Sequence, residues 1–134
     1  MKIAMIIVRT LMGLLFLVSS VAYFLIVWGV IPVPEVPPGP LKTFNEGLAA
    51  SGYFMMLLKI TELVCSLMLL SGRFVPLALV VLSPIIVNIL FVHIFLDRAG
   101  LPVAIFAVLA NIFLAYCYRD AFVPLLTPKY PASV

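Results

Sequence analysis

The stretch Thr10–Ile31, TLMGLLFLVSSVAYFLIVWGVI, decides the fold class of this chain. It contains no charged residue, and it exceeds the roughly 20 helical residues that cross the hydrocarbon core of a bilayer. We therefore predict a first membrane-spanning helix over residues 3–31. A signal peptide is the alternative, because Lys2 is basic and Ser20-Val21-Ala22 resembles a cleavage site. The apolar run continues without a break to Trp28, however, and this favours a membrane anchor.

The composition of the whole chain also indicates a lipid environment. Of its 134 residues, 66% are hydrophobic and 10% are charged, whereas a soluble domain is typically about half apolar and about a quarter charged. This balance excludes a cytosolic enzyme, a disordered chain and a secreted disulfide scaffold. The net charge of +3 is spread along the chain without a basic patch among aromatic residues. We therefore expect the lipid bilayer, and no nucleic acid, as a partner.

Proline and glycine divide the rest of the chain. Five prolines between Pro32 and Pro40 disfavour a regular helix and predict an extended loop outside the membrane. Three further helices are predicted, over residues 47–70, 74–96 and 101–118. The connections after the second and third helices are short, which makes their neighbours antiparallel. The sequence thus predicts an all-α membrane protein, an up-down bundle of four transmembrane helices that forms a single domain over residues 1–134.

The distribution of Lys and Arg predicts the orientation of this bundle. The end that holds both termini and the turn between the second and third helices has five of these residues: Lys2, Arg9, Arg73, Arg119 and Lys129. The other end has only Lys42 and Arg98. Because positive charge concentrates on the cytoplasmic side, we expect both termini in the cytoplasm.

Polar residues inside the predicted spans require partners, because a charged side chain at the bilayer centre is costly. Lys59 and Glu62 lie three residues apart on one face of the second helix. Counted from the helix ends at about 1.5 Å per residue, Arg9, Glu62 and Asn111 lie at similar depth. We therefore expect Arg9, Glu62 and Asn111 to form one buried polar cluster. Two roles are open for this cluster. It is either a fixed ion pair that locks the helices in place, or a site that handles a proton or a substrate.

A second group lies in the other half of the bundle, where Lys59, Asn88 and His93 are candidates for a ligand pocket. Asn88 and His93 should point about 140° apart on an ideal helix, so they should face one site only if Pro84 distorts the turn. The single histidine argues against a metal, haem or zinc site. Cys65 and Cys117 lie in separate spans, and we do not expect a redox-active pair.

Several strings resemble the DoxX family of small bacterial membrane proteins. They are SGYFMMLLKITEL at Ser51–Leu63, LSGRFVPLAL at Leu70–Leu79, SPIIVNI at Ser83–Ile89, HIFL at His93–Leu96, Gly100-Leu101-Pro102 and Tyr118-Arg119. The resemblance extends over nearly the whole chain and includes polar residues inside the spans. It implies a four-helix protein of the bacterial inner membrane, and some members of the family are associated with oxidative-stress and thiol-redox systems.

Two functions follow as expectations. The first is a non-catalytic membrane component of a redox or oxidative-stress system, with a redox protein or a second copy of the chain as partner. The alternative is a quinone-binding subunit of a membrane oxidoreductase. The sequence has no cofactor motif of its own, so a quinone is the one cofactor considered. Whether the chain is an enzyme stays open, and the residues favour a protein that does not catalyse a reaction on its own.

Overall fold

The computed structural model describes residues 1–134 and is built from helices without any strand. The α-helices and the two short 3₁₀ helices follow in the order α1 (Lys2–Val27), α2 (Pro40–Ala50), α3 (Phe54–Ser71), α4 (Val75–Phe95), η1 (Arg98–Gly100), α5 (Leu101–Cys117), α6 (Arg119–Phe122) and η2 (Val123–Leu126). The predicted all-α class with four principal helices is confirmed.

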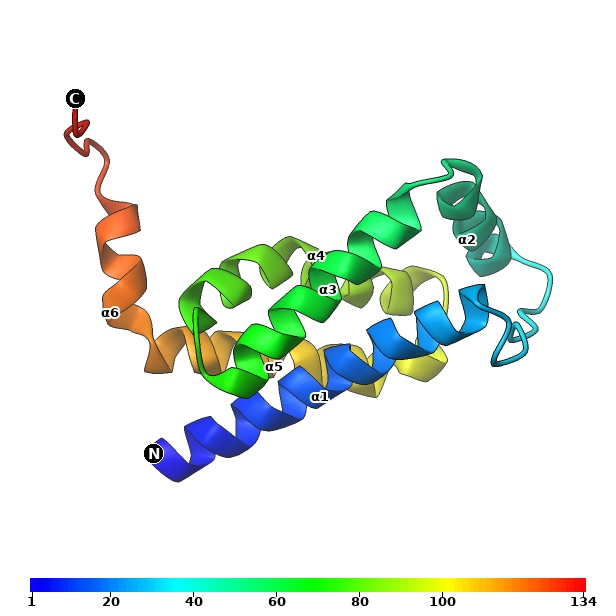
Figure 1. The fold of residues 1–134 in the computed structure, drawn as a ribbon, viewed down its shortest axis with the longest axis horizontal. Coiled ribbons are helices and arrows are strands. Elements are labelled where there is room, and N and C mark those ends of the chain that lie inside the picture. The colour runs from blue at the N-terminus through cyan, green and yellow to red at the C-terminus, as the bar shows by residue number, and fades with distance from the viewer.

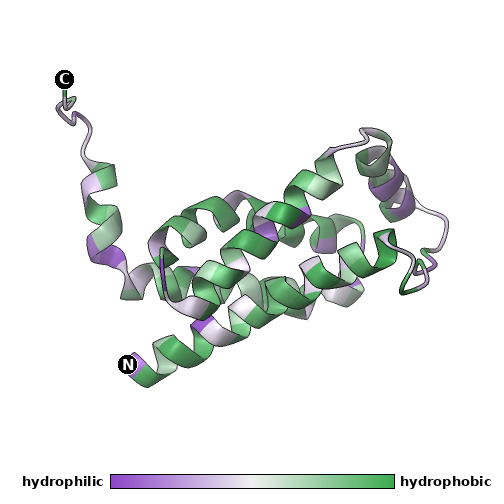
Figure 2. Cartoon of the chain, in the orientation of Figure 1, coloured by the Kyte–Doolittle hydropathy of each residue, from purple (hydrophilic) through white to green (hydrophobic).

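Four segments are long and apolar enough to cross a membrane, namely α1, α3, α4 and the combined η1–α5 segment. They run alongside one another in Figure 1, with α2 at one end of the bundle and both chain termini at the other. Hydrophobic residues cover these helices, and hydrophilic ones gather on α2 and near the C-terminus (Figure 2). The chain is therefore a multi-pass membrane protein.

Two of the spanning helices, α1 and α3, end in the same backbone arrangement around a glycine. At the end of α1, Gly29 has φ +76°, and the N–H groups of Gly29 and Val30 donate to the carbonyls of Ile26 and Leu25. This is the Schellman arrangement, which satisfies the last free carbonyls of a helix. It stops α1 at Val27, so the prediction that this helix continues to residue 31 is wrong. Gly72, with φ +73°, ends α3 in the same way.

The prediction of one continuous helix over residues 47–70 is wrong, because residues 51–53 are not helical and divide this region into α2 and α3. Ser51 makes the division: its hydroxyl donates to the Leu48 carbonyl and accepts from the Phe54 N–H. Gly52 then takes φ +80°, a conformation that side-chain-bearing residues rarely adopt. The prolines keep only residues up to Gly39 out of a helix, since Pro40 opens α2 at a position where its missing N–H costs nothing.

Close packing between α1 and α3 sets how these two antiparallel helices align. Gly13 of α1 lies against α3, where a Cβ atom would come within 2.8 Å of Leu70 Cγ. One end of the same contact brings the Arg9 guanidinium against Gly72, and the other brings Ser19 to Lys59. Small residues allow such approach in membrane bundles, where packing drives association. The alignment therefore depends on Gly13.

The buried core lies between all four spanning helices. Its largest fully buried side chains are Met12 of α1, Leu69 of α3, Leu79, Leu82 and Ile86 of α4, and Leu114 of α5. Three alanines, Ala104, Ala107 and Ala110, form a buried stripe along α5. Their small side chains let the neighbouring helices approach.

We predict that Gly13→Leu lowers the free energy of unfolding by about 1 to 3 kcal/mol, because the added side chain overpacks the α1–α3 contact. Thermal unfolding in detergent is the measurement. Val18→Leu is the matched control, since Val18 is an exposed residue of the same helix. A Gly13→Leu protein with the melting temperature of the wild type would show that α1 and α3 do not pack at this residue.

Candidate functional site

A cavity of about 320 Å³ lies at the end of the bundle where α2 is found. Residues of α1, α2, α3, α4 and α5 line it, and ten of the sixteen are hydrophobic. The polar ones are Ser19, Asn45, Lys59, Glu62, Asn88 and His93. A mostly apolar space with a few polar groups is the usual form of a small-molecule site.

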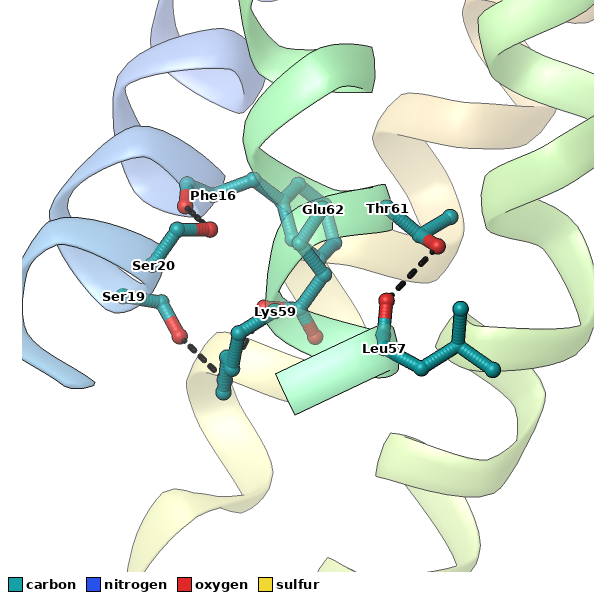
Figure 3. A network of polar contacts seen from close by, with 7 residues as sticks. All are labelled: Phe16, Ser19, Ser20, Leu57, Lys59, Thr61 and Glu62. Atoms are coloured by element: carbon teal, nitrogen blue, oxygen red, sulfur yellow. Dashed lines mark hydrogen bonds and ion pairs between the residues drawn. The ribbon is translucent and has the colours of Figure 1, made fainter. Parts of the chain in front are cut away.

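An ion pair forms one wall of this cavity. Lys59 Nζ donates to Glu62 Oε2 at 2.9 Å and to Ser19 Oγ at 2.9 Å. Figure 3 shows the three side chains meeting between α1 and α3. Glu62 is only 2% exposed, so Lys59 compensates a charge that neither water nor lipid could stabilise.

The same ammonium group keeps a donor for a ligand. A Lys side chain has three N–H groups, and the chain supplies acceptors for two of them. The third has no partner within the protein, although Lys59 lines the cavity. A ligand oxygen in the cavity can accept this hydrogen bond.

Asn88 contributes the amide group of α4. It is an exposed residue of a spanning helix, and its side-chain amide makes no hydrogen bond within the chain. An amide exposed to hydrocarbon without a partner is costly. Its donor and acceptor are therefore both available to a molecule in the cavity.

His93 is held at the same end of α4 by the turn that follows. Its Nδ1 lies 2.9 Å from the Asp97 carbonyl oxygen, and a hydrogen on Nδ1 donates to this oxygen. Gly100 makes room for the ring, because a Cβ atom there would overlap it. With Nδ1 engaged in this way, Nε2 of the neutral ring is left as an acceptor.

The cavity thus brings Lys59, Asn88 and His93 to one space, although their role in binding stays a prediction. Asn88 and His93 are expected to face one site only if Pro84 distorts the helix, and both line the cavity. Ile89 and Val92 lie between them on α4 and also line the cavity. The space therefore borders a broad arc of the helix, and no distortion is needed.

The predicted cluster of Arg9, Glu62 and Asn111 is wrong. Glu62 pairs with Lys59 of its own helix. Arg9 instead donates from Nη1 to the Tyr118 hydroxyl at 3.1 Å, which links α1 to the end of α5. Asn111 donates from Nδ2 to Ser83 Oγ at 3.0 Å, between α5 and α4.

Unequal helix lengths explain this error. With 26 and 18 residues, α1 and α3 are about 39 and 27 Å long at the helical rise. The first turns of α1 therefore extend past the end of α3, and Arg9 lies level with Gly72. Depth counted from each helix end does not identify residues in one plane.

Two parts of the site, α2 and Ser19, were not predicted from the sequence. Phe44, Asn45 and Leu48 of α2 line the cavity, but this helix was divided between a predicted loop and a predicted span. The Ser51-Gly52 pair is the local signal for this division, since the same dipeptide at Ser71-Gly72 ends α3 and both glycines have a positive φ. Ser19 belongs to the site only because the packing of α1 against α3 brings its hydroxyl to Lys59.

The sulfur atoms and the carboxylates form no further centre. Cys65 is buried and Cys117 is partly buried, and neither is in a disulfide. No three His, Cys, Asp or Glu residues come together in a way that could hold a metal ion. The cavity is therefore the principal candidate site.

We predict that Lys59→Met lowers the free energy of unfolding by about 3 to 5 kcal/mol, because it leaves the Glu62 carboxylate buried without a partner. Adding Glu62→Leu should recover much of this loss. Chemical or thermal unfolding in detergent measures the double-mutant cycle. The control cycle pairs Arg9→Leu with Glu62→Leu, whose effects should add because these side chains do not interact. Additive losses for Lys59 and Glu62 would contradict the ion pair.

Comparisons of the chain with models of protein families, with curated proteins and with solved structures found no match. A function must therefore be inferred from the chemistry of the residues that line the cavity.

Proposed function

We propose that this protein is a DoxX-type component of the bacterial inner membrane that binds a quinone-type headgroup and presents it to a redox or oxidative-stress partner. The observation that supports this proposal is the free N–H of Lys59 in a mostly apolar cavity that Asn88 and His93 also line. Binding, rather than catalysis by this chain alone, is the function proposed.

A quinone head matches the cavity in its chemistry. It is a flat, apolar ring with carbonyl oxygens that accept hydrogen bonds. Lys59 on α3 and Asn88 on α4 offer donors from two different helices, and the hydrophobic residues offer contact to the ring. A donor already in place also stabilises the negative charge that develops on a carbonyl oxygen during reduction.

His93 and Glu62 give this site groups that can exchange protons. The Nε2 atom of His93 is not used by the chain, and an imidazole nitrogen can accept or donate a proton. Glu62 likewise uses only Oε2 for its ion pair. These groups suit a ligand whose reduction is accompanied by proton uptake, with the electrons supplied by a partner protein.

A second candidate is a scaffold without a ligand, in which the polar residues only hold the helices together. One observation favours it. The segment Arg119–Leu126 projects away from the bundle (Figure 1), and Leu125 and Leu126 are strongly exposed. A partner protein or a second copy of the chain could cover this segment.

We also propose that both termini are cytoplasmic and that the cavity lies in the outer half of the membrane. The Arg9–Tyr118 hydrogen bond brings the start of α1 and the end of α5 together. Seven Lys and Arg residues lie outside the α3 ion pair. Five of them belong to this end of the chain, namely Lys2, Arg9, Arg73, Arg119 and Lys129, and Lys42 and Arg98 belong to the other. The positive-inside rule supports this orientation.

We predict that the purified protein binds a benzoquinone with a short alkyl chain, and that Asn88→Leu weakens binding about tenfold through the loss of one hydrogen bond. Titration calorimetry and thermal shift in detergent are the measurements. The double variant Lys59→Met/Glu62→Leu should also weaken binding, with the buried charge removed.

Thr61→Val is the matched control for these variants. Thr61 lies on α3 beside the ion-pair residues in sequence, but it does not line the cavity and its hydroxyl bonds to the Leu57 carbonyl. The Thr61→Val protein should bind the quinone with the affinity of the wild type. A wild-type protein that shows no quinone binding and no thermal shift, and that purifies with a stoichiometric protein partner, would support the scaffold instead.

Reporter fusions test the orientation. A reporter that is active only in the periplasm should be active when inserted into the loop at residues 32–38 and inactive when fused after residue 134. The reverse pattern would place the cavity in the cytoplasmic half of the membrane and overturn the proposed orientation.

A further inference from the structure

A second hollow, of about 240 Å³, adjoins the cavity. The two spaces share four lining residues, Leu48, Leu58, Asn88 and Ile89. The remaining lining residues of the second hollow are Phe54 of α3 and Pro84 and Ile85 of α4. The second hollow is therefore a continuation of the cavity between two membrane-spanning helices, and we call it the α3–α4 groove.

We infer that the α3–α4 groove holds the hydrocarbon chain of the ligand whose headgroup occupies the cavity. The inference rests on the proposed function and narrows its ligand to a quinone with one long prenyl chain. The head lies beside Lys59, and the chain leaves between α3 and α4 into the bilayer.

The lining of the two spaces supports this division between head and chain. The cavity has six polar residues, including the ion pair, whereas Asn88 is the only polar side chain of the groove. Asn88 therefore lies where polar and apolar spaces meet. A cavity of about 320 Å³ suits a headgroup, and a long prenyl chain needs a further path.

The exposure of Asn88 also supports this inference. Asn88 is an exposed amide on a helix whose other outward residues are hydrophobic, such as Val80, Val87 and Phe91. Hydrocarbon leaves such an amide without hydrogen bonds, at a cost that a bound headgroup removes. Passage of the ligand along the α3–α4 groove brings its head to this amide.

The other extension of the cavity is less suited to a hydrocarbon chain. A third hollow shares Asn45, Leu48 and Met55 with the cavity. It is also lined by Val33 of the proline-rich loop and by Gly52 and Tyr53 of the α2–α3 connection. Tyr23 of α1 and Met56 of α3 also line this hollow, but Val33, Gly52 and Tyr53 lie outside the four spans, so it opens toward the end of the bundle.

Blocking the groove should separate long-chain from short-chain ligands. In Ile85→Trp the larger side chain fills the groove. We expect it to raise the Kd for a quinone with a long prenyl chain at least tenfold, and the Kd for the short-chain quinone less than twofold. Binding is measured with both ligands for each variant in lipid nanodiscs.

Val87→Trp is the matched control, because Val87 lies two residues further along α4, is exposed and lines neither space. It should leave both affinities unchanged. Phe54→Trp blocks the groove from α3 and repeats the test if Ile85→Trp lowers the melting temperature.

The outcomes separate this inference from the function on which it rests. A wild-type protein that binds neither quinone overturns both. Short-chain binding together with unchanged long-chain affinity in Ile85→Trp and Phe54→Trp overturns the groove alone. Equal weakening of both ligands would also overturn it, since the substitutions would then disturb the headgroup site.

Discussion

The ion pair between Lys59 and Glu62 is the interaction on which the cavity end of the molecule depends. A carboxylate that is 2% exposed within a spanning helix has neither water nor lipid to stabilise it, and Lys59 compensates it from one turn away. Ser19 then accepts a hydrogen bond from the same ammonium group, which connects α1 to α3. The pair therefore makes a charged helix compatible with the membrane and leaves one N–H of Lys59 without an acceptor in the chain.

The contact of Ser19 with the Lys59–Glu62 ion pair depends on the close approach of α1 and α3. Gly13 lets the helices pack where a larger residue would meet Leu70, and the resulting alignment sets Ser19 against Lys59. At the opposite end the same alignment carries Arg9 to Gly72 and to the Tyr118 hydroxyl. Arg9 and Ser19 thus make polar contacts on either side of the α1–α3 contact, and Met12 and Phe16 pack into the apolar core between them.

Part of the site could be predicted from residue spacing. Lys59 and Glu62 share a helix face because they are three residues apart, and this is a property of the helix alone. Lys59, Asn88 and His93 could be assigned to one half of the bundle from their positions along the helices. The contribution of α2 could not be predicted in the same way, because Phe44 and Leu48 become cavity residues only when the chain turns at Ser51-Gly52.

The sequence by itself determined that this is an all-α chain with four apolar helices and short connections after the second and third of them, because hydrophobic length, proline and glycine act locally along the chain. Only the tertiary structure decided which polar groups meet. Lys59 bonds to Ser19, Arg9 to Tyr118, and Asn111 to Ser83, each across two helices. Depth along a helix is one coordinate, whereas a contact also requires the rotation of each helix and its offset from its neighbours. Packing at Gly13 and the unequal lengths of α1 and α3 set that offset, so the sequence positions alone did not reveal it.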